Sequence, residues 1–136
     1  MPVWIAVRTP GDEHVVTSRA PFSPETTDAL VRAARSVRSD SPTPSVESHH
    51  SIYVVLLELA DGEYGLYVGL TGLTPEERYL KHKAGHKASR WVRKYGIGLL
   101  PALYRHLNPL DWEPATHVEV ALAEALASIG ILVKQG

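Results

Sequence analysis

The chain has 136 residues, of which 44% are apolar and 21% charged, and its formal net charge is −1. These values fit one soluble globular domain with a real core, with or without a small appendage. The absence of cysteine excludes disulfides, thiol catalysis and cysteine-ligated zinc. No run is long enough to span a membrane, and residues 1–13 lack the pattern of a signal peptide. We therefore expect a cytoplasmic protein with no membrane partner.

The start of the chain predicts a small extension made of two strands and a helix. Residues 3–8 and 14–18 have the composition of short strands on either side of a Pro-Gly-Asp turn. Ser23, followed by Pro and Glu, predicts the start of a helix that runs to about Val37. This extension carries no obvious chemistry.

A Ser- and Pro-rich segment, residues 39–47, is the best candidate for a boundary. We therefore expect an N-terminal extension over residues 1–47 and a second domain over residues 48–136. His49 and His50, next to this boundary, are either a metal pair or, as we favour, ordinary residues at the entrance of a strand.

The centre of the chain predicts two antiparallel strands. Residues 51–60 are almost wholly apolar and rich in Val, Ile, Leu and Tyr, which favours a strand buried on both faces. An Asp-Gly pair at 61–62 suits a two-residue hairpin turn, and residues 64–70 form the returning strand. Glycines flank Thr71, so the backbone there can approach a ligand closely.

A helix follows, with clear signals at both ends. The Thr-Pro-Glu-Glu run that begins at Thr74 is a capping box with Pro at the first helical position, and Gly85 is a natural stop. Arg78 and His82 are four residues apart, so we expect them on the same face of this helix.

The segment after this helix gives weaker signals. Residues 87–94 predict a short basic helix or loop anchored by Trp91 and ended by two glycines. Residues 99–107 fit either an edge strand or a helix that starts near Pro101, because proline is awkward inside a central strand.

A last helix is expected from near Pro114 to about Ser128, with Glu119 at the edge of its apolar stripe. A carboxylate in that place is costly unless a cation, a metal ion or several hydrogen bonds compensate for its desolvation. Glu119 is therefore either a metal ligand or the partner of a Lys or Arg of the basic segment. The stripe consists of Ala115, Val118, Leu122, Leu126 and Ile129.

Basic residues are concentrated in one acid-free segment. Eight Lys and Arg lie between Arg78 and Arg105, and no Asp or Glu lies between Glu77 and Asp111. This pattern predicts either a partner that carries phosphates or a solvated helical face. The candidate nucleic-acid contacts are Thr71, Lys81, Lys83, Lys87, Arg90, Arg93 and Lys94.

The chain resembles the GIY-YIG endonuclease superfamily over roughly residues 51–133. Ser51-Ile52-Tyr53 stands where that family has Gly-Ile-Tyr, and Tyr67-Val68-Gly69 stands where it has Tyr-Ile-Gly. Ser for Gly and Val for Ile are small departures. Residues 1–47 lie outside the resemblance.

Four further positions extend the resemblance. Thr71 fits the usual continuation of the second tripeptide, and Arg78 and His82 follow at the spacing of many members. Glu119 resembles the Glu that is the family's metal ligand. Many members carry an Asn after the metal helix, whereas here Gln135 is the only amide nearby, which leaves that role open.

The resemblance implies a small α/β (α+β) fold with a central, mainly antiparallel three-stranded sheet flanked by helices. It also implies a metal-dependent endonuclease that hydrolyses phosphodiester bonds in DNA, with Mg²⁺, or Mn²⁺ in its place, held by Glu119. The catalytic residues implied are Tyr53, Tyr67, Arg78, His82 and Glu119.

The resemblance assigns a role to each side chain. Arg78 would bind the scissile phosphate through its fork of donors. Tyr53 would act as general base or position the water, and Tyr67 would donate a hydrogen bond to a phosphate oxygen or the nucleophile. His82 would serve as an auxiliary base or donor.

Other interpretations of the same residues remain open. The two tyrosines fit strand core positions, Arg78 fits a surface ion pair, and His82 fits a packing or capping role. The alternatives for the whole protein are a non-catalytic module that binds nucleic acid or protein on the same fold, and an accessory subunit that needs another chain. A homodimer or a complex with a partner protein is also compatible with the sequence.

Overall fold

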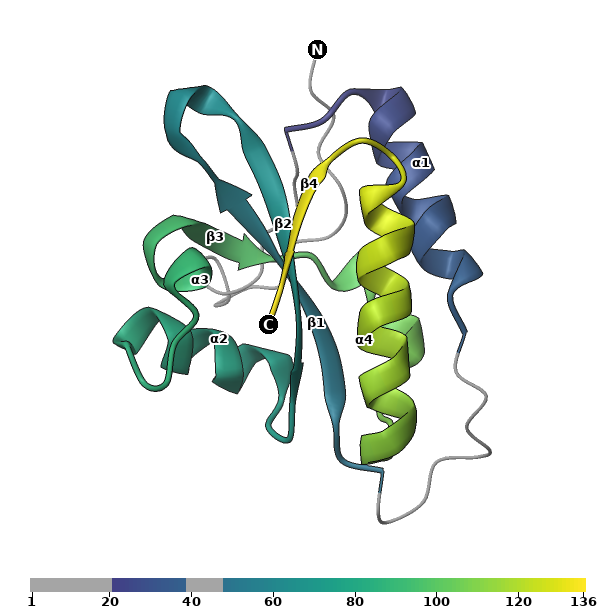
Figure 1. The fold of residues 1–136 in the computed structure, drawn as a ribbon, viewed down its shortest axis with the longest axis vertical. Helices are drawn as coiled ribbons and strands as arrows, with labels where there is room; N and C mark the ends of the chain where they lie inside the picture. The colour runs from purple at the N-terminus through teal and green to yellow at the C-terminus, as the bar shows by residue number, and fades with distance from the viewer. Residues whose placement is uncertain (1–20, 39–47) are drawn as a thin grey trace.

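The computed structural model of the protein describes residues 21–38 and 48–136 (Figure 1). The strands expected at residues 3–8 and 14–18 and the linker expected at residues 39–47 lie outside the described residues. Within the two described ranges, no helix is long and apolar enough to cross a membrane.

Within the described residues, a four-stranded mixed sheet forms the centre of this α/β fold. Its strands are β1 (Ser51–Glu58), β2 (Tyr64–Thr71), β3 (Gly96–Leu99) and β4 (Leu132–Gln135), in the spatial order β3-β1-β2-β4. β1 pairs antiparallel with β2 and β3, whereas β4 pairs parallel with β2. The expectation of three strands was therefore wrong, because short strands such as β4 leave little periodic signal.

The connection between β1 and β2 differs from the expected two-residue turn. It is a 3₁₀ turn over Ala60–Gly62, closed by a 2.7 Å hydrogen bond from the Leu59 N–H to the Glu63 carbonyl. The strands pair from Ser51 opposite Thr71 to Glu58 opposite Tyr64 without a break. The longer turn shortens β1 by two residues and leaves the register that fixes the site intact.

Helices cover both faces of the sheet (Figure 1). On one face lie α1 (Pro24–Ser36) and α4 (Trp112–Ala127), which contact each other. On the other face lie α2 (Pro75–Ala84) and α3 (Arg90–Tyr95). The signals expected for α2 are confirmed, because Thr74 forms the capping box and Gly85 ends the helix with φ +89°.

The structure of residues 96–107 differs most from the predictions made for residues 48–136. The glycines expected to end the basic segment belong to β3, which pairs with β1. The segment from 99 to 107, expected as an edge strand or one helix, forms two 3₁₀ turns, Pro101–Leu103 and Arg105–Leu107. The first turn buries Leu103 and the second buries Leu107. A regular strand or helix is therefore not needed to bring these apolar side chains into the core.

Helix α1 shares its core with the rest of the described chain. Leu30 and Ala34 are fully buried, as are Ala115 and Leu122 of α4, and all four belong to the same apolar cluster. A buried leucine at this interface removes apolar surface of both helices from water.

We expect Leu30→Ala to lower the free energy of unfolding by about 2–4 kcal/mol, because it leaves a cavity between α1 and α4. Urea unfolding followed by circular dichroism measures this change. Arg32→Ala, at an exposed position of the same helix, is the control and should change it by less than about 0.5 kcal/mol. A Leu30→Ala protein as stable as the parent would show that α1 does not contribute to this core.

Candidate functional site

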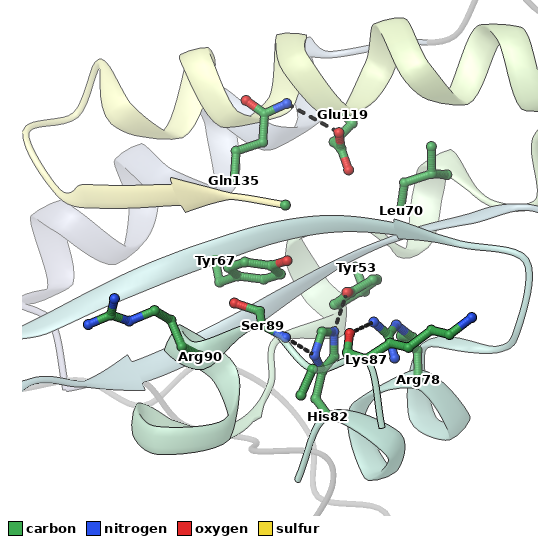
Figure 2. A pocket seen from close by; sticks show the side chains of 12 residues that line it. Tyr53, Tyr67, Leu70, Arg78, His82, Lys87, Ser89, Arg90, Glu119 and Gln135 are labelled. Atoms are coloured by element: carbon green, nitrogen blue, oxygen red, sulfur yellow. Dashed lines mark hydrogen bonds between the residues drawn. The ribbon is translucent and has the colours of Figure 1, made fainter. Parts of the chain in front are cut away.

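A pocket of about 490 Å³ lies where β4 ends beside the longer strand β2 (Figure 2). Both layers of helices contribute to it. Figure 2 shows Glu119 and Gln135 on the α4 side of the sheet and the tyrosines, His82 and Arg78 on the α2 side. All five residues predicted to be catalytic line the pocket: Tyr53, Tyr67, Arg78, His82 and Glu119.

The strand register brings the two tyrosines together. Tyr53 pairs with Gly69 and Tyr67 with Val55, so both side chains point to the same face of the β1–β2 pair. Their ring centroids are 6.2 Å apart, and both residues are buried. Burial of both rings leaves their hydroxyls as the parts that can act in the pocket.

Gly69 is required by the position of the Tyr53 ring. A Cβ at this residue would lie 2.4 Å from Cζ of Tyr53 and 2.5 Å from its hydroxyl oxygen. Any side chain at this position would displace the ring. The packing of the Tyr53 ring therefore explains why the last residue of the second tripeptide, Gly69, is a glycine.

His82 is held in one tautomer by its two hydrogen bonds. The Ser89 N–H donates to His82 Nδ1 at 2.9 Å, so Nδ1 carries no proton. The proton of the neutral ring is therefore on Nε2, which donates to the Tyr53 hydroxyl oxygen at 2.7 Å. Burial, reinforced by the charge of Arg78, lowers the pKa of His82 to about 4.

Tyr53 consequently keeps its own O–H for another acceptor. Burial raises its pKa well above the ordinary value, the nearby Tyr67 adds to this, and the charge of Arg78 acts in the opposite direction. The hydroxyl is thus protonated in the free protein at neutral pH. It accepts one hydrogen bond from His82 and can donate one to a molecule in the pocket.

Arg78 holds the loop that follows α2. Its guanidinium donates from Nη1 to the His86 carbonyl at 3.1 Å and from Nη2 to the Lys87 carbonyl at 2.8 Å. Lys87 has φ +45°, so these two bonds stabilise an unfavourable backbone conformation. The guanidinium has five N–H donors, which leaves three for a ligand.

Glu119 meets the amide of Gln135 across the pocket. Gln135 Nε2 donates to Glu119 Oε1 at 3.2 Å. Burial raises the pKa of Glu119, and the hydrogen bond from Gln135 partly opposes this. Gln135 was the only amide that the sequence offered at this end of the chain, and its side chain does contact the proposed metal ligand.

The donor set suits a hydrated hard cation. Among the described residues, no three His, Cys, Asp or Glu side chains gather as a metal-binding group, at His49-His50 or elsewhere. A cation at Glu119 would therefore have one carboxylate and water for its remaining positions, because Gln135 turns the N–H donors of its amide towards Glu119. Mg²⁺ binds in this way, whereas a structural zinc ion requires four protein ligands.

The predicted nucleic-acid contacts fall into three groups. Lys87 and Arg90 line the pocket. Lys83 donates to three backbone carbonyls around the end of α3, and the Thr71 hydroxyl accepts from the Leu73 N–H, so both side chains have partners inside the protein. The remaining candidates are exposed: Lys81, Arg93 and Lys94.

Sequence reasoning did not identify four residues that line the pocket: Leu70, Ala88, Ser89 and Gly136. The backbone N–H of Ser89 fixes His82, and a backbone group leaves no mark in the residue pattern. Gly136 lines the pocket beside Tyr67, and its N–H bonds to the Val68 carbonyl at 3.1 Å. Recognition of β4 as a strand was the missing step.

Comparison with known proteins finds no matching family model, no matching curated protein and no matching solved structure. The resemblance to the GIY-YIG superfamily therefore rests on the sequence motifs alone.

We expect stability to fall as the pH is lowered from 6.5 towards 4. Over this range the unfolded state takes up a proton on His82 that the folded state does not bind, so acid favours unfolding. The contribution is at most about 3 kcal/mol. Urea unfolding at several pH values measures it.

His82→Gln should flatten this pH dependence, because glutamine does not titrate. His117→Gln, at an exposed position of α4, is the control and should retain the slope of the parent. Parallel curves for the parent and His82→Gln would contradict the neutral, buried state of His82.

Proposed function

We propose that the protein is a metal-dependent endonuclease that hydrolyses phosphodiester bonds in DNA. The observation that supports this most is the convergence of Tyr53, Tyr67, Arg78, His82 and Glu119 on one pocket. These side chains come from four separate elements, so their meeting is a property of the fold and not of one local segment.

The pocket has the charges that phosphodiester hydrolysis needs. The reaction builds negative charge on the phosphate oxygens, which cations and hydrogen-bond donors must stabilise. Arg78 and Lys87 lie on one side of the tyrosines and Arg90 on the other (Figure 2). A divalent ion held by Glu119 would supply further neutralisation when bound.

The proton arrangement gives Tyr53 a defined role. Because His82 donates to its oxygen, the phenol O–H is directed to another acceptor and can hold the attacking water in place. Burial raises the pKa of Tyr53, so loss of its proton depends on positive charge near the hydroxyl. A phenolate formed there would keep the hydrogen bond from His82 and so be stabilised.

The remaining residues act on the phosphate. The donors of Arg78 that the loop leaves free would bind a non-bridging oxygen. The Tyr67 hydroxyl lies in the same pocket and would donate to a second oxygen. These contacts would orient the phosphorus towards the water that Tyr53 holds.

A second candidate is a non-catalytic module that binds nucleic acid on the same fold. It is favoured by the fact that Arg78 and Glu119 already have partners inside the protein. This candidate requires salt-dependent binding without a metal ion.

We expect Glu119→Gln to slow nicking of supercoiled plasmid about 100-fold or more with Mg²⁺ or Mn²⁺, because the only carboxylate that lines the pocket among the described residues is lost. Glu124→Gln is the matched control, since Glu124 is exposed on the same helix. Conversion of supercoiled to open-circular DNA is the measurement. If the parent did not nick, or if Glu119→Gln nicked equally fast, the endonuclease proposal would be abandoned.

Tyr53→Phe should reduce the single-turnover cleavage rate about 100-fold, because it removes the hydroxyl between His82 and the pocket. Tyr64→Phe, outside the pocket on β2, is the control. Since the variant leaves His82 Nε2–H without its partner, circular dichroism must first show that both proteins are folded. A rate within threefold of the parent would remove Tyr53 from the mechanism.

A further inference from the structure

A cluster of aromatic and basic side chains lies beside the pocket on α3 and β4. The rings of Trp91 and Tyr95 are one helical turn apart, with centroids at 5.8 Å. Lys134 Nζ lies 4.5 Å from the centroid of Trp91, and Lys94 Nζ lies 5.2 Å from that of Tyr95. We name these four residues, together with Arg90, the α3–β4 surface.

The α3–β4 surface is continuous with the pocket. Arg90 lines the pocket and its guanidinium carbon lies 6.0 Å from the centroid of its neighbour Trp91. Gln135 also lines the pocket, and the preceding residue, Lys134, covers Trp91. Because side chains alternate along a strand, β4 turns Gln135 towards Glu119 and Lys134 towards α3.

The charge of this surface is of one sign. α3 and β4 contain four Lys and Arg residues and no acidic residue. The cations that lie over the Trp91 and Tyr95 rings belong to the long, flexible side chains of Lys134 and Lys94. Such contacts between a cation and an aromatic face are worth about 0.5–1 kcal/mol at an exposed site, so they can be exchanged for a ligand.

We propose that the α3–β4 surface binds a single strand of nucleic acid that continues into the pocket, with one base stacked on Trp91. A base would replace the Lys134 ammonium on the indole face, and the displaced ammonium would then pair with a backbone phosphate. Interior bases of a duplex would have to leave their own stack to make this contact, which costs a few kcal/mol. The path into the pocket rests on the proposed nuclease function, whereas the stacking does not.

Binding of fluorescein-labelled oligo-dT in EDTA tests the proposal without cleavage. Trp91→Leu should weaken oligo-dT binding about 10-fold, because a stacked base contributes about 1–3 kcal/mol. The same change should alter binding of a duplex of equal length less than twofold. Trp112→Leu, which removes an exposed tryptophan 59% accessible on α4, is the control and should leave both affinities unchanged.

Two further readouts separate stacking from charge. Oligo-dT should quench tryptophan fluorescence in the parent and in Trp112→Leu, and this quenching should be lost in Trp91→Leu. Lys134→Gln should lower the slope of log affinity against log salt for oligo-dT by about 0.7, the value for one phosphate contact on a single strand.

The proposal is overturned if folded Trp91→Leu binds oligo-dT as tightly as the parent, or if it loses single-strand and duplex binding equally. Equal losses would indicate that the Lys134–Trp91 contact only holds β4 in place. These outcomes differ from failure of the nuclease proposal, which is judged by Mg²⁺-dependent nicking in the parent and Glu119→Gln.

Discussion

The hydrogen bond between His82 and Tyr53 is the interaction on which the rest of the site depends. It joins a helix on one face of the sheet to the central strand β1, and its 2.7 Å length leaves little freedom to either side chain. The Tyr53 ring can reach this position only because Gly69 on the neighbouring strand has no Cβ. The two tripeptides are thus coupled physically, since the glycine of one accommodates the tyrosine of the other.

The loop after α2 supports this bond from outside the sheet. Arg78 binds two of its carbonyls and Ser89 supplies the N–H that orients the His82 ring. Arg78 therefore both fixes the loop and lines the pocket. A point charge could not do both, because the loop is held by hydrogen bonds from two nitrogens of the guanidinium. Replacement by lysine would keep the charge and lose the paired hydrogen bonds.

The sequence predicted the parts of the fold that have strong local signals. Helix α2 was predicted from its capping box and final glycine, and the β1–β2 pair from its apolar runs, because these features act over a few residues. β3 and β4 have four residues each, and they become strands only through pairing with β1 and β2. The site shows the same dependence on long-range contacts. Side chains with characteristic chemistry could be predicted as site residues, whereas the contacts of Ser89 and Gln135 form only in the tertiary structure.

Strand β4 links the integrity of the sheet edge to the completeness of the pocket. It pairs with β2 at four positions and, among the described residues, with no other strand. Short edge strands open locally at a lower free-energy cost than a protein's core. Fraying of β4 would withdraw Gln135 from Glu119 and Lys134 from Trp91 together, while His82 and Tyr53 remained paired. Occupancy of the pocket and of the α3–β4 surface would then be cooperative, because a ligand that contacts either residue of β4 would also anchor the other.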